Sequence, residues 1–448
     1  MVNNLSQYNS RYVMAISFVS ALGGYLFGFD FAVISGALPF LKQSFGLTPV
    51  WEGFVTGSLA LGCIIGCLMA GSIAEKYGRR PGLMLAAIIF AGSALAMAFA
   101  GSLTMFIAMR LMAGIGVGMA SLLSPLYIAE ISPTAVRGRN VAINQLTIVI
   151  GILFTNLVNY FLADHGADAW RWMFGLGFIP SFFFFVGVLW LPESPRWLLK
   201  AGREEEAKKV LHKIGNDIYA TGLFNDIKNS LRGQDKGSWR SLLGKNVWPA
   251  VTIGIGLAIF QQLCGINIVF NYTSTIFASV GANLDRQLFE TIAIGFVNLL
   301  FTVVAMWQVE KLGRRPLMLI GSLGLGILYI LLSWALYMQL STGWISLIVL
   351  LSIAVYATSL APVTWVLISE IFPNRIRGHA SSVAIVSLWA AYFVLVFTFP
   401  LLVAFLGTYG PFYLYAVICL LGFFFIKGKV RETKGRSLEE MEEVMIRH

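Results

Sequence analysis

Two ionisable side chains, Asp30 and Arg110, lie deep within long apolar stretches of the sequence. A carboxyl group in such surroundings can exchange a proton when its environment changes, because burial disfavours its charge and a nearby cation favours it. Arginine stays charged at physiological pH, so it can serve as the counter-charge. The two residues therefore predict a proton-binding ion pair, with a static structural pair as the alternative.

Uncharged polar side chains form a second group within the apolar stretches. They are Asn144, Gln145, Gln261, Gln262, Asn267, Asn271, Asn298, Trp365 and Trp389. Amides supply donors and acceptors, and aromatic faces cover the C–H surface of a ring. This combination suits a neutral polyol better than an ion or a charged metabolite. Hydrogen bonding between neighbouring membrane helices is the alternative use of the same amides.

Two charged motifs occur twice in the chain. Glu75-Lys-Tyr-Gly-Arg-Arg-Pro81 returns at 310–316, and Glu130-Ile-Ser-Pro-Thr-Ala-Val-Arg-Gly138 returns in similar form at 370–378, with offsets of 235 and 240 residues. Guanidinium and carboxylate groups form directional pairs, so we expect a salt-bridge gate at one membrane face. Plain membrane-surface charge is the alternative. The gate residues are Glu75, Arg79, Arg80, Glu130, Arg137, Glu310, Arg314, Arg315, Glu370 and Arg377.

Membrane-spanning helices must position these residues. Hydrophobic residues make up 57% of the chain and charged residues 12%, and the mean hydropathy is +0.76, which is too apolar for a soluble domain. The apolar runs are continuous and have the length of a spanning helix, about 20 residues. We expect twelve spans, at 12–36, 51–74, 82–100, 104–129, 141–163, 173–192, 249–279, 288–309, 316–338, 344–369, 380–404 and 409–426.

The repeated motifs divide the chain into two parallel six-span halves, which is typical of an alternating-access transporter. The expected fold is an all-α membrane protein with pseudo-symmetric helix bundles at 1–194 and 247–427. A cytoplasmic helical linker at 195–246 and a cytoplasmic tail at 428–448 complete the predicted organisation. Asp30 and Arg110 each lie about six positions, roughly 9 Å, from the same membrane face, so an ion pair between them is feasible.

The net charge of +10 follows the expected topology. Of 32 lysines and arginines, 27 fall in the loops after even-numbered spans and in the C-terminal tail. By the positive-inside rule, both termini face the cytoplasm of a multi-pass cell-membrane protein. No nucleic-acid partner is therefore expected. The four cysteines lie in spans with no histidine nearby, so we expect neither a metal site nor a cofactor.

The sequence resembles the sugar porter family of the major facilitator superfamily over nearly its whole length. The resemblance rests on Gly28-Phe-Asp-Phe-Ala-Val-Ile-Ser-Gly36, both Gly-Arg-Arg loops, Pro192-Glu-Ser-Pro-Arg-Trp197, Gln261-Gln-Leu-Cys-Gly-Ile-Asn267 and Arg431-Glu-Thr-Lys-Gly435. It implies that Asp30 and Arg110 couple a proton to transport, and it adds Glu193 and Arg196 to the gate. The residues that it implies for the sugar are Gln145, Gln261, Gln262, Asn267, Asn298 and Trp365, with Phe27 and Trp389 lining the site.

Several positions depart from the family pattern and bear on the substrate. Ile152 stands where the xylose symporter has a sugar-contacting glutamine, and Leu388 replaces an expected amide. Asn271 stands where the family usually has tyrosine. A hexose such as glucose is the expected substrate, with xylose as the second candidate. Asp30 favours symport, because facilitative members usually carry asparagine at that position.

Other functions fit the sequence less well. An enzyme would need a nucleophile and base within reach of one site, and a channel would not need the repeated charged motifs. A uniporter that retains Asp30 for structure is the main alternative, and a sugar sensor is the alternative from another class. We expect a monomer in the lipid bilayer whose partners are a sugar and a proton.

Overall fold

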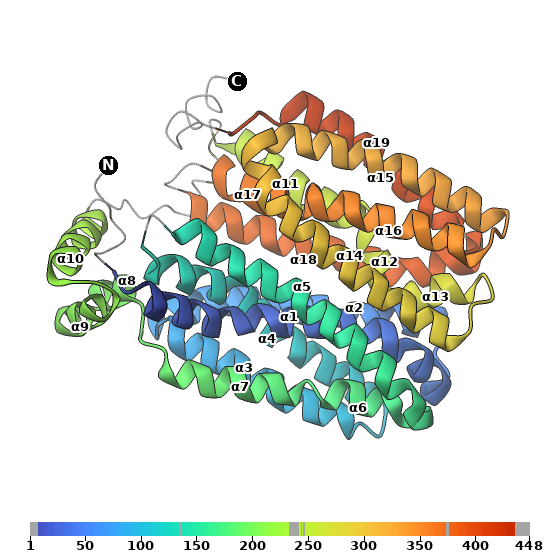
Figure 1. The fold of residues 1–448 in the computed structure, drawn as a ribbon, viewed down its shortest axis with the longest axis horizontal. Helices are drawn as coiled ribbons and strands as arrows, with labels where there is room; N and C mark the ends of the chain where they lie inside the picture. Colours follow the sequence, from blue (N-terminus) through green and yellow to red (C-terminus); the bar gives the residue numbers. More distant parts are fainter. Residues whose placement is uncertain are drawn as a thin grey trace. The chain divides into compact units, whose positions relative to one another are not determined.

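The computed structural model describes residues 8–133, 136–232, 242, 244, 247–372 and 376–434. Within these residues, the secondary structure is helical apart from one isolated β-bridge between Tyr8 and Gly215. The helices (Figure 1) are α1 (Ser10–Phe45), α2 (Pro49–Lys76), α3 (Arg79–Ala98), α4 (Leu103–Ile131), α5 (Arg137–Leu162), the 3-10 helix η2 (Ala163–Asp168), α6 (Ala169–Gly175), α7 (Phe178–Trp190), α8 (Pro195–Lys200), α9 (Glu204–Ile214), α10 (Asp217–Arg232), α11 (Trp248–Leu263), α12 (Ile266–Asn271), α13 (Thr273–Ala278), α14 (Leu284–Leu312), α15 (Arg314–Tyr337), α16 (Thr342–Thr358), α17 (Leu360–Ile371), α18 (Arg377–Leu406) and α19 (Gly410–Lys429).

Eleven helical stretches of the described residues are long and apolar enough to cross a membrane. One of them, Arg137–Trp190, is 54 residues long and contains α5, η2, α6 and α7. At 1.5 Å per residue it would extend about 80 Å, more than twice the apolar thickness of a bilayer. Gly166 interrupts it with a φ of 78°. This stretch therefore contains both the fifth and the sixth predicted span, and the predicted twelve-helix architecture is confirmed.

The chain divides into two compact units. Unit 1 consists of Met1–Asp30, Gly62–Gly151 and Phe174–Asp235, and unit 2 consists of Phe31–Leu61, Ile152–Met173 and Lys236–His448. The boundaries fall inside α1, α2 and α5, so one part of each of these helices belongs to each unit. The division by sequence repeats, at 1–194 and 247–427, stays a proposal about how the protein is organised.

Close backbone packing holds α2 and α4 together in unit 1. A Cβ atom at Gly62 would strike the carbonyl oxygen of Leu111, and one at Gly66 would strike that of Ile115. Small residues four apart permit this approach between membrane helices, where van der Waals contact replaces the hydrophobic driving force. In the same unit α3 packs on α4 and α7 (Figure 1). Arg110 on α4 lies within this packed layer and is buried.

In unit 2, α15 packs on α19 and α16, α11 packs on α18, and α14 packs on α16. Parts of the first six spans belong to this unit and are attached to it by side chain-to-backbone hydrogen bonds. Ser274 Oγ donates to the carbonyl of Ser35 at 2.9 Å, and Asn156 Nδ2 donates to the carbonyl of Thr291 at 2.7 Å. These bonds join the unit 2 parts of α1 and α5 to α13 and α14.

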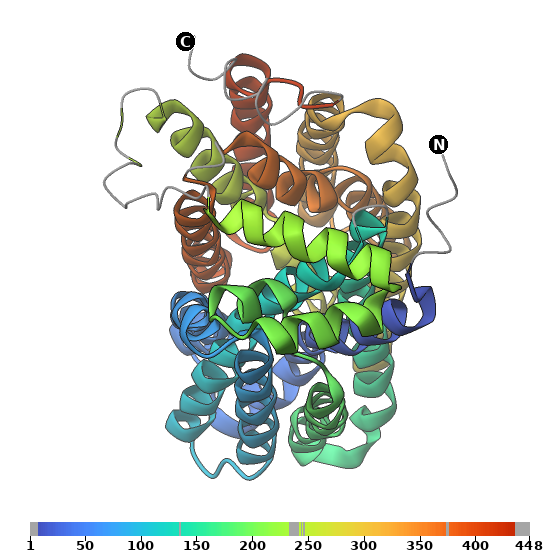
Figure 2. The ribbon, with the colours of Figure 1, turned by 90° about the vertical axis from the view of Figure 1, so that its left-hand side faces the viewer.

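Three short helices, α8 to α10, follow the sixth span and lie at one end of unit 1. Figure 2 shows α9 and α10 (green) running across the axes of the long helices rather than along them. Their apolar sides form small cores, one from Trp197, Leu198 and Ala207 and another from Leu211, Ala220 and Phe224. Residues 195–232 of the predicted linker thus contain three helices, the remainder of the segment lies mostly outside the described residues, and its role as a linker between two halves stays a prediction.

Candidate functional site

Asp30 on α1 and Arg110 on α4 form a buried ion pair in unit 1. The exposed fractions of the two residues are 3% and 1%. Arg110 Nη1 donates to Asp30 Oδ1, and it also reaches the carbonyl oxygen of Asp30 at 3.4 Å. The guanidinium carbon lies 5.4 Å from the centre of the Phe174 ring, within cation–π range. The spacing of the spans predicted that this pair was feasible, and the tertiary structure forms it.

The second carboxylate oxygen of Asp30 has no hydrogen-bond partner among the described residues. Asp30 also lines a cavity of about 10 Å³ with a mostly apolar lining that includes Leu26, Phe90 and Met97. A space of that size holds about one water molecule and no sugar. The geometry therefore suits the exchange of a proton at Asp30 rather than direct contact between Asp30 and a polyol.

Three amides of the seventh span gather in unit 2 around a break in the helix. Gly265 has a φ of +90° and separates α11 from α12, and a Cβ atom there would strike the ring of Tyr415. Across this break Asn267 Nδ2 donates to Gln262 Oε1, and Gln262 Nε2 lies 3.4 Å from Gln261 Oε1. These three side chains are 2–6% exposed. A straight helix would not bring Gln262 and Asn267 onto one face.

The other residues expected to bind sugar are described within their own units. In unit 2, Asn298 on α14, Trp389 on α18 and Ile152 on α5 are buried, whereas Trp365 on α17 is 39% exposed. In unit 1, Phe27 on α1 and Gln145 on α5 are half-buried. Their role in binding stays a prediction.

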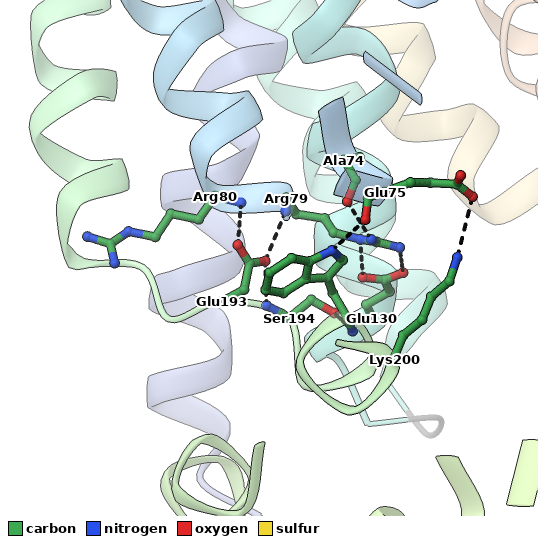
Figure 3. Close-up of polar contacts among 9 residues, drawn as sticks. Ala74, Glu75, Arg79, Arg80, Glu130, Glu193, Ser194 and Lys200 are labelled. Carbon is green, nitrogen blue, oxygen red and sulfur yellow. Dashed lines mark hydrogen bonds and ion pairs between the residues drawn. The ribbon is translucent and has the colours of Figure 1, made fainter. Parts of the chain in front are cut away.

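Charged residues concentrate at the helix ends that carry the Gly-Arg-Arg loops, here called the basic ends. In unit 1, Arg79 forms a bidentate salt bridge with Glu130, in which Nε and Nη2 lie 2.8 and 2.7 Å from the two carboxylate oxygens (Figure 3). Its Nη1 also donates to the carbonyl of Ala74 at 2.9 Å. Arg79 at the start of α3 is thereby attached to the ends of both α2 and α4, which agrees with the strength and direction of such pairs.

Glu193 accepts hydrogen bonds at the beginning of α3. Its two oxygens lie 3.0 and 3.1 Å from the backbone N–H groups of Arg79 and Arg80, and Ser194 N–H donates at 2.7 Å (Figure 3). The first N–H groups of a helix lack partners within the helix and attract negative charge. Burial raises the pKa of the Glu193 carboxyl, and the hydrogen bonds from Ser194, Arg79 and Arg80 oppose that rise.

Unit 2 repeats the same arrangement with different residues. Arg314 pairs with Glu370 at 3.1 Å, and the backbone N–H groups of Arg314 and Arg315 each donate at 3.0 Å to Glu432. Thr433 Oγ1 donates to Glu370 at 2.6 Å. Burial acts to raise the pKa of Glu432, but four backbone N–H donors outweigh it and hold that pKa below its ordinary value.

Glu432 is a member of this cluster that the sequence analysis did not assign to the gate. The repeat spacing could have indicated Glu432, because it follows Glu193 by 239 residues, within the 235–240 range of the other repeats. Glu193 is preceded by Pro192 whereas Glu432 is preceded by Arg431, and this difference makes the two local sequences less similar. Without the structure, nothing in either sequence indicates that both carboxylates cap a helix.

The remaining gate residues have weaker or undescribed contacts. Glu75 is exposed and lies 3.5 Å from Lys200 (Figure 3), a type of pair that contributes little. Arg137 is exposed and Arg196 is half-buried, and both line a cleft between α10 and the end of α4 in unit 1. Two gate side chains lie outside the described part of the structure, those of Glu310 and Arg377.

Two carboxylates that the sequence analysis did not single out are buried in unit 2. Glu52 on α2 is 6% exposed and pairs with Lys42 at 2.7 Å. Glu290 on α14 is 1% exposed, pairs with Arg286 at 2.5 Å and accepts from Ser346 at 2.6 Å. Both lie in the first two turns of their helices, where sequence position does not distinguish a solvated side chain from a buried one.

Replacing Glu193 by alanine is expected to lower the free energy of unfolding by about 1–2 kcal/mol, the range found for lost helix caps. The change leaves the N–H groups of Arg79 and Arg80 without their acceptor. The melting temperature in detergent measures the effect. Glu193→Gln keeps one acceptor oxygen and should lose less, and the exposed Glu75→Ala is the control. Equal losses for Glu75→Ala and Glu193→Ala would contradict the capping role.

Apolar helices, the buried ion pair of Asp30 and Arg110, and a broken helix lined by amides together define a multi-pass membrane transport protein. A family model described as "Sugar (and other) transporter" matches residues 16–445. The chain belongs to this sugar transporter family of the major facilitator superfamily, whose members are transporters and not enzymes.

Individual relatives match over almost their full length. The chain is 39% identical to the D-xylose-proton symporter of Escherichia coli K12, over 98% of this chain and 96% of the symporter. It is also 39% identical to the glucose transport protein of a Synechocystis strain, over 97% of this chain and 98% of that protein. The fold is similar to the inward-open conformation of the E. coli xylose transporter XylE, with a TM-score of 0.86, 37% identity and coverage of 97% and 100% of the two chains.

Proposed function

We propose that the protein is a proton-coupled symporter that imports a monosaccharide by alternating access. The observation that carries this proposal is the buried ion pair of Asp30 and Arg110. A pair removed from solvent contributes little net stability, and ionisable groups inside a membrane are usually kept for function. The E. coli relative, which matches this chain almost end to end, is named as a proton symporter.

The surroundings of Arg110 support a site that works in two protonation states. When Asp30 is ionised, Arg110 pairs with its carboxylate. When Asp30 takes up a proton at its uncommitted oxygen, the guanidinium keeps two neutral partners, the Asp30 carbonyl oxygen at 3.4 Å and the face of Phe174. The cost of leaving Arg110 without an anion is thereby reduced. Protonation loosens the attachment of α1 to α4 without exposing an unpartnered charge.

Within this proposal the sugar binds to the amides at the helix break. Gln261, Gln262 and Asn267 supply donors and acceptors, and Trp365 and Trp389 supply ring faces. Asn298, Phe27, Gln145 and Ile152 complete the proposed set. A hexose such as glucose is the proposed substrate, with xylose second, because Ile152 removes an amide that the resemblance places against xylose.

The basic ends are proposed to face the cytoplasm, together with both termini, in accordance with the positive-inside rule. The charged clusters there are proposed to act as the gate. The pairs of Arg79 with Glu130 and of Arg314 with Glu370 each lie within one unit. We propose that contacts of this kind hold the cytoplasmic side shut and break when it opens.

Sugar-driven proton flux in proteoliposomes tests the proposal. Addition of glucose without a pH gradient is expected to make the external medium more alkaline, because each imported sugar carries protons inward. Uptake without any pH change would identify a uniporter instead. A panel containing glucose, xylose and galactose tests the substrate, and faster uptake of xylose than of glucose would contradict the hexose assignment.

A further inference from the structure

A continuous series of hydrogen bonds runs through unit 2 from α18 to the amides at the helix break. The Tyr392 hydroxyl donates to Asn271 Oδ1 at 3.1 Å, and Asn271 Nδ2 donates to the backbone carbonyl of Asn267 at 2.7 Å. Asn267 Nδ2 then donates to Gln262 Oε1. Asn271 is completely buried and Tyr392 is 1% exposed. The series thus begins at a group without access to solvent and ends at residues proposed to bind the sugar.

The direction of the first two bonds is dictated by chemistry. A backbone carbonyl only accepts, so Asn271 must turn its NH₂ group toward Asn267. Its own carbonyl oxygen is then directed the other way, where the Tyr392 hydroxyl donates to it. Asn271 therefore has one amide orientation in which both groups are satisfied. A reversed amide would leave a buried donor and a buried acceptor unpaired, at a cost of about 1–3 kcal/mol each.

We propose that Tyr392 and Asn271 are positioning residues that hold the α12 backbone at Asn267, and with it the bonded side chains of Asn267 and Gln262, in one place and so determine which sugar hydroxyl configuration is accepted. The inference rests on the proposed sugar site. The series uses Asn267 Nδ2 and leaves Asn267 Oδ1 available to accept from a hydroxyl group. A site whose polar groups are held in place discriminates strongly against a ligand that pairs them badly.

The packing of α18 does not depend on the Tyr392 hydroxyl. Tyr272 donates to the carbonyl of Val396 at 2.9 Å, and its ring lies 4.8 Å from that of Phe399. These contacts attach the same two segments close to Tyr392. The ring of Tyr392 also packs against Trp389, with centroids 5.8 Å apart. A phenylalanine at 392 would keep the ring contact with Trp389 and remove the donor to Asn271, so this variant tests the hydrogen bond separately from the packing.

The test is Tyr392→Phe, with Tyr329→Phe as the matched control. Tyr329 is a buried tyrosine of the same unit whose hydroxyl has no hydrogen-bond partner among the described residues. Binding of glucose and of its C4 epimer galactose is measured by titration calorimetry. Tyr392→Phe should weaken glucose binding about tenfold and bring the two affinities closer together. Tyr329→Phe should change neither, and Tyr392→Phe should melt at a somewhat lower temperature than Tyr329→Phe, because it leaves the buried Asn271 Oδ1 without a donor.

Gln262→Ala separates failure of this inference from failure of the proposed site. If Gln262→Ala binds glucose normally, the sugar binds elsewhere and the proposed function of these amides fails. If Gln262→Ala loses binding while Tyr392→Phe keeps both its glucose affinity and the ratio of its glucose and galactose affinities, the positioning role is overturned. If Tyr392→Phe binds glucose more weakly but keeps the same ratio of the two affinities, the positioning role is also overturned. Should Tyr392→Phe fail to fold, Asn271→Leu removes the bond to Tyr392 together with the bond to the Asn267 carbonyl, and its glucose and galactose affinities are judged by the same criteria.

Discussion

Asp30→Asn is expected to abolish proton-driven accumulation of sugar while leaving sugar binding and sugar exchange in place. Asparagine has nearly the shape of aspartic acid, keeps an acceptor for Arg110 and cannot take up or release a proton. The variant resembles the protonated state permanently, so the protein can still bind sugar and change conformation. What it loses is the link between the pH gradient and the direction of transport.

Accumulation in proteoliposomes under an imposed pH gradient measures this loss, and exchange of labelled for unlabelled sugar measures the retained steps. Glu290→Gln is the matched control, because Glu290 is also a buried carboxylate paired with an arginine but belongs to unit 2. It should accumulate sugar as the wild type does. Normal accumulation by Asp30→Asn would remove the coupling role and leave the uniporter.

Gln262→Ala is expected to weaken sugar binding about ten- to a hundredfold. Removing this side chain takes away a proposed sugar contact and also leaves Asn267 Nδ2 without its acceptor in a buried position. Loss of a buried hydrogen-bond partner costs about 1–3 kcal/mol, and each 1.4 kcal/mol corresponds to about tenfold in affinity.

Equilibrium binding in detergent measures the affinity directly. Gln287→Ala is the control, since Gln287 is a buried amide on α14 that donates to the Ala282 carbonyl and has no place in the proposed site. Its removal should leave the affinity unchanged. An equal loss in both variants would show a general effect of losing buried amides, and the sugar site would have to be placed elsewhere.

The local sequence was sufficient for the architecture. Transfer of a helix into a bilayer depends on length and hydropathy, which any stretch of about 20 residues displays by itself. The repeats at Arg79 and Arg314 likewise show two related halves without any reference to contacts. Asp30 and Arg110 could be placed at equal depth because depth follows from helical rise alone.

The tertiary structure determined which side chains form hydrogen bonds and ion pairs with one another. Gln262 and Asn267 meet because Gly265 turns the chain between α11 and α12, and spacing in a straight helix argued against one shared face. Glu193 and Glu432 became helix caps only when distant segments brought them to the first turns of α3 and α15. The burial of Glu290 depends on α16, 56 residues away at Ser346. Hydropathy is a property of a segment, whereas a hydrogen bond depends on where two segments meet, and only the folded chain determines that.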